Sequence, residues 1–120
     1  MIDLRKKTGD KGEKLALKHL KAKGYKLLEK NWRKVGGELD LIMVDGEFII
    51  FVEVKTRNND KSQVSPKLQM TKNKILQVRK IAQYYLLEKR NEDLQPRFDF
   101  VGITLKADEK PEIEHIENAF

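Results

Sequence analysis

Residues 37–42 read Gly-Glu-Leu-Asp-Leu-Ile, and residues 51–57 read Phe-Val-Glu-Val-Lys-Thr-Arg. Between these runs lies Asp45-Gly46, a dipeptide that readily adopts the positive φ angles of a tight turn. The flanking residues are mostly β-branched, aliphatic or aromatic, as is typical of strands. The stretch therefore predicts an antiparallel hairpin with a two-residue loop at Asp45 and Gly46, and the rest of the chain is organised around it.

The loop length determines which side chains share a face of the hairpin, because side chains alternate along a strand. With this loop, Asp40 becomes a diagonal neighbour of Glu53, at a typical backbone separation of about 7–8 Å. Glu38 and Lys55 fall on the same face. A loop one residue longer would move Asp40 to the other side of the sheet.

Two converging carboxylates beside a lysine suit a divalent metal ion. Mg²⁺ takes oxygen ligands and is commonly held by one or two carboxylates together with a substrate phosphate. Asp40 and Glu53 are the candidate ligands, and Lys55 is placed to orient a water molecule or to offset charge on phosphorus. The alternative is ordinary: the solvent face of a hairpin is usually polar, and charged cross-strand pairs are common.

The two runs with the intervening turn resemble the signature of the PD-(D/E)xK nuclease superfamily. More narrowly, the chain resembles the YraN family of small, endonuclease-like bacterial proteins, which are similar to archaeal Holliday junction resolvases. The resemblance extends over nearly the whole chain: Gly12-Glu13, Ala16 and Leu20, Gly24-Tyr25, Asn31-Trp32-Arg33, Thr71 and Lys74, Arg97-Phe98-Asp99, Glu114-His115-Ile116 and Asn118-Ala119-Phe120. It implies a restriction-endonuclease-like core, a Mg²⁺ (or Mn²⁺) cofactor, branched DNA as a substrate, and a possible homodimer.

The composition is that of a single globular domain over residues 1–120. The chain has no cysteine, which excludes disulfides and thiolate metal sites. No run approaches the roughly 20 apolar residues of a membrane span, so a cytoplasmic protein is expected.

The net charge of +6 is unevenly distributed along the chain. Residues 1–36 hold twelve Lys/Arg and four Asp/Glu, and residues 71–97 hold seven and three, whereas residues 37–70 hold four and six. An acidic middle between basic segments suits an enzyme that grips a phosphate backbone and keeps acidic ligands for a cation. Solvated lysine-rich helix faces are the simpler explanation.

A first helix is expected from about Asp10 to Lys23, with an apolar stripe through Ala16 and Leu20. Glu13 stands on this inward stripe, and its carboxylate needs an explanation. Reciprocal capping with Asp10 at the helix start is one. The other, which rests on the resemblance, is that Glu13 joins the metal shell directly or through water, and Glu38 is a further candidate ligand.

The remaining elements are an early strand (25–30), a loop (58–70), a long helix capped by Thr71 that ends near Lys89, a strand (97–105) and an edge strand around 113–115. Together with the hairpin they predict an α/β domain with a central mixed β-sheet flanked by helices. Asp99 is expected to pair with Arg97 rather than to act in catalysis. Trp32 is expected in the core. The candidate phosphate contacts are Arg33, Arg57, Lys72 and Lys74.

These features favour a Mg²⁺-dependent phosphodiesterase acting on DNA, with Asp40, Glu53, Lys55 and Glu13 in the catalytic site. A nucleic-acid-binding module that has the fold without turnover is the second hypothesis. The third is an interaction protein whose acidic face contacts a basic partner. Cleavage in Mg²⁺ or Mn²⁺ identifies the first, and DNA binding without cleavage identifies the second.

Overall fold

The computed structural model describes residues 4–58, 70–89 and 93–120. Within them the five strands form one mixed sheet of order β1-β2-β3-β4-β5, in which β3 and β4 run parallel and the other neighbours antiparallel. The predicted α/β class, with a mixed sheet flanked by helices, is confirmed. The elements in chain order are α1 (Leu4–Ala22), β1 (Lys26–Lys34), β2 (Gly37–Asp45), β3 (Phe48–Asn58), α2 (Lys72–Lys89), β4 (Gln95–Leu105) and β5 (Glu112–Ile116).

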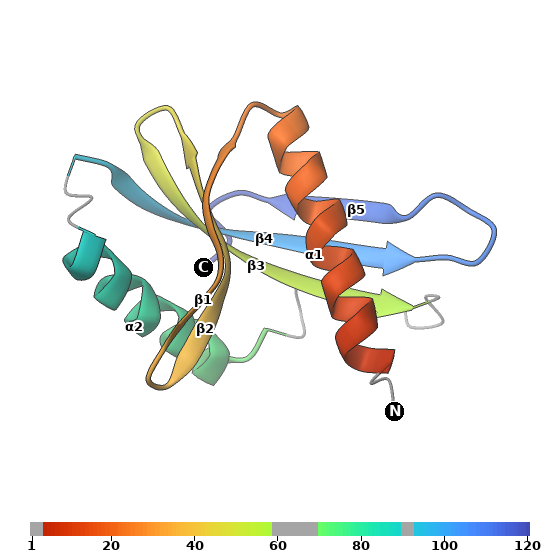
Figure 1. Ribbon diagram of the computed structural model, residues 1–120, viewed down its shortest axis with the longest axis horizontal. Helices are drawn as coiled ribbons and strands as arrows, with labels where there is room; N and C mark the ends of the chain where they lie inside the picture. The colour runs from red at the N-terminus through yellow and green to blue at the C-terminus, as the bar shows by residue number, and fades with distance from the viewer. Residues whose placement is uncertain (1–3, 59–69, 90–92) are drawn as a thin grey trace.

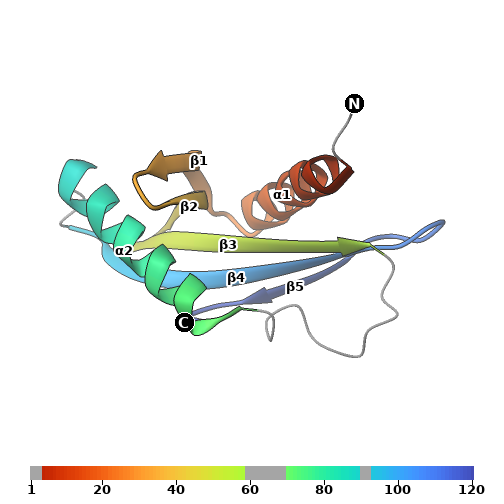
Figure 2. The same cartoon turned by 90° about the horizontal axis from the view of Figure 1, so that it is seen from below.

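The two helices cover opposite faces of the sheet. Ile50 and Val52 of β3 belong to the core under α1, whereas the alternate residues Ile49 and Phe51 pack against α2. Figure 1 shows α1 crossing in front of β3, β4 and β5, with α2 beside the hairpin of β1 and β2. In Figure 2, β3 to β5 form a layer beneath α1, and the β1–β2 hairpin rises from it on the same side as the helix.

The turn between β2 and β3 differs from the prediction by one residue. Asp45 pairs with Phe48, so the loop is Gly46-Glu47 rather than Asp45-Gly46. Gly46 has φ 57° and occupies the first loop position, where a type II′ turn needs glycine. The shift moves each cross-strand partner by two residues along the strand, so every side chain stays on its predicted face of the hairpin. Asp40 therefore lies directly across from Glu53 instead of diagonally.

Two further boundaries differ from expectation. α1 begins at Leu4, six residues before the predicted Asp10, so Asp10 and Glu13 lie inside the helix and the capping explanation is wrong. β1 continues to Lys34 and includes Trp32. Trp32 packs against the α2 core as predicted and makes an edge contact with Tyr85, at 5.1 Å between ring centroids.

The second helix and the last strands agree with the sequence analysis. Thr71 caps α2, because its Oγ1 accepts a hydrogen bond from the Lys74 backbone N–H at 3.1 Å. Residues 59–69, most of the predicted loop, lie outside the described residues. Asp99 pairs with Arg97 as expected, at 2.8 Å. Among the described residues, neither helix has the length and apolar content needed to cross a membrane.

Close packing of α1 on β3 depends on Gly12. A Cβ atom added to Gly12 would lie 2.7 Å from Cβ of Thr56, closer than two carbon atoms can approach. We expect Gly12→Ala to push α1 away from β3 and to lower the free energy of unfolding by about 1–3 kcal/mol. Chemical denaturation measures the change.

Gly9→Ala is the matched control for this prediction, because a Cβ on Gly9 in the same helix has no atom within 4 Å. Alanine is the better helix former, so this variant should be as stable as the wild type or up to about 1 kcal/mol more stable. Equal effects of the two substitutions would contradict the close approach.

Candidate active site

Asp40 and Glu53 face each other where β2 and β3 separate. Backbone pairing of the two strands runs from Asp45 and Phe48 only as far as Leu41 and Val52. At the next position a side chain replaces the backbone as hydrogen-bond acceptor: Oδ2 of Asp40 accepts a hydrogen bond from the backbone N–H of Val54 at 2.8 Å. The strands therefore form a fork, and the carboxyl groups of Asp40 and Glu53 lie close enough inside it to influence each other's charge.

The Glu53 carboxyl is buried, and its surroundings offset only part of the cost of a charge there. The residue is 5% exposed, and Oε2 receives no hydrogen bond from the described part of the chain. Burial raises the pKa of Glu53 to about 9, the Asp40 charge adds to the effect, and Lys74 partly offsets it. Lys74 lies 3.6 Å from Oε1 and is the charged partner of Glu53. A cation bound beside Glu53 would therefore lower the electrostatic cost of ionising this carboxyl.

Glu13 approaches this pair from α1. Its pKa is raised to about 7, first by burial and then by the charges of Asp40, Glu38 and Asp10. The close packing at Gly12 brings this turn of the helix down onto the sheet. The structure therefore brings together four carboxylates from three separate elements. We call them the acidic cluster: Glu13, Glu38, Asp40 and Glu53.

Asn31 connects two of these carboxylates. With its amide oriented to satisfy both, Nδ2 donates to Oε1 of Glu13 and to Oε1 of Glu38, each at 2.8 Å. Asn31 has φ 52°, a left-handed conformation that asparagine tolerates better than most residues. Glu38 also pairs with Arg33 at 3.2 Å. Two donors thus hold Glu38, so it is less suited than Asp40 or Glu53 to bind a cation directly.

Only some of the predicted basic residues lie against the acidic cluster. Lys55 follows Glu53 on the same face of β3 and is exposed; among the described residues, no ion pair joins it to Asp40 or Glu53. Arg57 donates to Thr104 on β4 at 3.3 Å. Lys72 is exposed at the start of α2. Of the predicted phosphate contacts, Lys74 and Arg33 lie against the acidic cluster.

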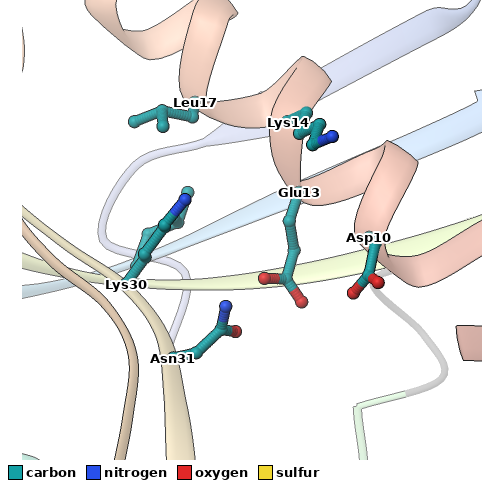
Figure 3. A pocket seen from close by; sticks show the side chains of 7 residues that line it. Asp10, Glu13, Lys14, Leu17, Lys30 and Asn31 are labelled. Atoms are coloured by element: carbon teal, nitrogen blue, oxygen red, sulfur yellow. The ribbon is translucent and has the colours of Figure 1, made fainter. Parts of the chain in front are cut away.

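Two adjoining cavities flank Glu13. One, of about 270 Å³, is lined by Asp10, Glu13, Lys14, Leu17, Lys30, Asn31 and Leu41. The other, of about 550 Å³, is lined by Lys6, Gly9, Asp10, Glu13, Asn31, Arg33 and Glu38. In Figure 3, Asp10 and Glu13 descend from α1 toward Asn31, and Lys30 extends from β1 toward the helix.

Sequence reasoning missed the bridging role of Asn31 and the contributions of Lys14 and Lys30. Asn31 was named only as one of the residues that carry the resemblance, and its left-handed φ has no local signal beyond the residue type. Lys14 and Lys30 line one cavity from consecutive elements, α1 and β1, and their approach depends on how the helix docks onto the sheet rather than on any spacing in the sequence.

The donor set fits a hard divalent cation held mainly by two carboxylates. No three carboxylate or imidazole groups of the described residues are already arranged to hold a metal ion. Mg²⁺ needs only one or two carboxylates, because water and phosphate oxygens supply its other ligands. Asp40 and the buried Glu53 meet that need, and Glu13 lies near Asp40.

The raised pKa of Glu53 predicts a pH-dependent stability. Since the pKa is about 9 in the folded protein and 4.5 without the fold, the folded state binds more protons between these values. Stability should therefore fall as pH rises from about 5 to 9, by at least about 1 kcal/mol. Denaturation in EDTA at several pH values measures this.

Glu53→Gln is the comparison for the pH prediction, because glutamine is neutral and nearly isosteric with a protonated glutamate. The variant should lose less stability across the same range. A parallel decline in the two proteins would exclude Glu53 as the source.

Comparison with known proteins places this fold and site in a family. A family model described as uncharacterised protein family UPF0102 matches residues 12–103. The chain belongs to the UPF0102 family. A UPF0102 protein of Thermodesulfovibrio yellowstonii is 46% identical over 112 residues, which cover 93% of this chain and 94% of the relative. The UPF0102 protein of Geobacter metallireducens is 44% identical over 115 residues, covering 96% and 93%.

The family match includes the whole acidic cluster. Residues 12–103 begin one position before Glu13 and contain Asn31, Glu38, Asp40 and Glu53. The predicted relationship to the YraN family is the UPF0102 membership found here. The UPF0102 description itself names no activity, so the function is argued from the site.

Proposed function

We propose that this UPF0102 protein is a divalent-metal-dependent endonuclease that hydrolyses DNA phosphodiester bonds at branched or irregular structures. The observation that carries the proposal is the pairing of Asp40 with the buried Glu53 at the strand fork, where one oxygen of Glu53 receives no hydrogen bond from the described residues. The resemblance of this hairpin to the PD-(D/E)xK nucleases supports the same chemistry.

In this proposal Asp40 and Glu53 hold Mg²⁺ or Mn²⁺, and Glu13 supports the ion directly or through water. The ion, when bound, polarises a phosphoryl oxygen and lowers the pKa of a bound water. Asp40 is fixed for this role by the Val54 N–H. Asn31 holds Glu13 in place, so the acidic groups do not need to reorganise when substrate arrives.

The basic residues have separate roles. Lys55 is exposed beside Glu53 and can reach a substrate phosphate or the attacking water. Lys74 lies 3.6 Å from Glu53, and at the start of α2 it is placed to contact phosphate once a metal ion occupies the site. During hydrolysis, water adds to phosphorus, one P–O bond breaks, and the leaving oxygen gains a proton.

A nucleic-acid-binding module without turnover is the second candidate. It is favoured by the exposure of Lys55, which no ion pair with the described residues holds near the carboxylates. Under this alternative the basic segments still bind DNA, but the carboxylates do not assemble a reaction centre.

A cleavage screen separates the two candidates. Single-stranded, duplex, flap and four-way DNA are incubated with the purified chain in Mg²⁺, Mn²⁺ or EDTA. The nuclease proposal requires cleavage that depends on metal and is strongest on branched or irregular DNA. Salt-sensitive binding of DNA without cleavage in either metal would identify the binding module. Absence of both binding and cleavage would reject both candidates.

A further inference from the structure

The smaller cavity beside Glu13 has a composition that the catalytic chemistry does not require. It lies between α1 and β1, and its lining includes the apolar side chains of Leu17 and Leu41 as well as two lysines. Leu41 is only 1% exposed, so the half-buried Leu17 is the apolar side chain that is open to a bound group. A metal ion and a phosphate need only charged or polar ligands, so the apolar surface of Leu17 is available to a different chemical group.

Lys14 and Lys30 contribute the positive charge of this cavity. Both are exposed, and neither makes an ion pair with any described residue, although Asp10 and Glu13 line the same cavity. By contrast, Arg33 and Lys74 each pair with a carboxylate of the cluster. Lys14 and Lys30 are therefore available to an anion from outside.

We propose that this cavity receives an unpaired nucleotide of the DNA substrate, with its base against Leu17 and its phosphate at Lys14 and Lys30. The inference rests on the proposed function and adds a preference for strands that are locally single. A base is neutral, so it can lie beside Asp10 and Glu13, while the phosphate stays with the lysines.

The geometry disfavours a paired duplex in this position. In a duplex the bases are stacked and paired, and only phosphates, sugars and base edges face outward. Enzymes that place a base in a pocket therefore unstack it or use a strand that is already single. A recess of about 270 Å³ between a helix and a strand has room for a small group rather than for a double helix.

The test compares binding of a 12-nucleotide single strand with binding of the matching duplex, measured by fluorescence anisotropy in EDTA over a range of salt concentrations. Lys30→Ala should lower the slope of log affinity against log salt for the single strand by about 0.7, the value for one lost phosphate contact. The slope for the duplex should not change. Lys26→Ala is the matched control, since Lys26 is exposed on the same strand and does not line the cavity.

A second variant tests the base contact. Leu17→Trp places a large side chain in the cavity and should weaken single-strand binding at least about 10-fold, as expected for loss of base packing. Duplex binding should again be unaffected. Circular dichroism checks folding, and if Leu17→Trp is unfolded, the surface double variant Lys14→Ala/Lys30→Ala decides the question with an expected slope change of about 1.4.

The outcomes separate this inference from the proposed nuclease activity. Equal losses for single strand and duplex, or no loss for either, would overturn the nucleotide site while leaving metal-dependent cleavage intact. Strand-selective losses in a protein that cuts no DNA would support the nucleotide site and reject the nuclease. Strand-selective losses together with cleavage of unpaired regions would support both.

Discussion

Replacement of Asp40 by asparagine should reduce metal-dependent DNA cleavage by at least about 100-fold. Loss of groups that merely support metal ligands typically costs 10–100-fold, and a direct ligand should cost at least as much. Asparagine keeps the size of the side chain and an oxygen that can accept the Val54 N–H. The substitution therefore removes the charge and preserves the strand fork, so the variant should remain folded.

Two further measurements make this prediction specific. Mg²⁺ should raise the melting temperature of the wild type and have little effect on Asp40→Asn, because a ligand stabilises only the state that binds it. Affinity for DNA in EDTA should be retained. Asp45→Asn is the matched control, since Asp45 lies at the other end of β2 beside the turn. Unchanged cleavage by Asp40→Asn would reject the proposed metal site.

Arg97→Met should give the largest loss of stability among single substitutions outside the site. The Asp99 carboxylate is fully buried and accepts two hydrogen bonds from Arg97, at 2.9 and 2.8 Å, and one from His115 at 2.8 Å. Methionine fills the space of the aliphatic part of the arginine side chain but removes both arginine hydrogen bonds to the buried Asp99 carboxylate. We expect a loss of about 3–5 kcal/mol in the free energy of unfolding.

The pH dependence provides a second readout for Arg97→Met. Burial alone would raise the pKa of Asp99, but hydrogen bonds from His115 and Arg97 outweigh it and hold the pKa below its usual range. The resulting stability is present above the pKa of the unfolded chain, near 3.8, and is lost as pH falls through the lower folded value. At neutral pH, Arg97→Met should therefore already be less stable than the wild type.

Lys106→Met is the control for the buried pair. Lys106 pairs with Glu112, whose side chain is 66% exposed, and surface pairs of this kind contribute at most about 1 kcal/mol. Chemical denaturation of both variants gives the comparison. A loss for Arg97→Met no larger than that for Lys106→Met would mean that the buried pair does not stabilise the fold.

The hairpin could be predicted from sequence because its signals are local. Asp45-Gly46 marked the turn, and the alternation of apolar and charged residues placed Asp40 and Glu53 on one face. The loop position was wrong by one residue, because glycine can occupy either central position of a two-residue turn and the choice determines the turn type. The error left the faces unchanged, since it moved every partner by two residues.

The surroundings of Asp40 and Glu53 could be predicted only in part. Glu13 was marked by its position on the apolar stripe of α1, where a carboxylate is costly. Its proximity to Asn31 depends on how α1 docks onto the sheet, which neither segment encodes alone. The start of α1 was also misplaced, because Asp10 and Glu13 have the spacing of a helix cap although they lie within the helix.

The parallel pairing of β3 with β4 has a consequence for the order in which the protein folds. β2 and β3 meet across a two-residue turn, so they can associate after closure of a very short loop. β4 pairs with β3 only after the chain from residue 59 to residue 94 has returned, which costs more chain entropy and slows assembly. The hairpin that carries Asp40 and Glu53 should therefore form early, and the burial that raises the Glu53 pKa should be completed late.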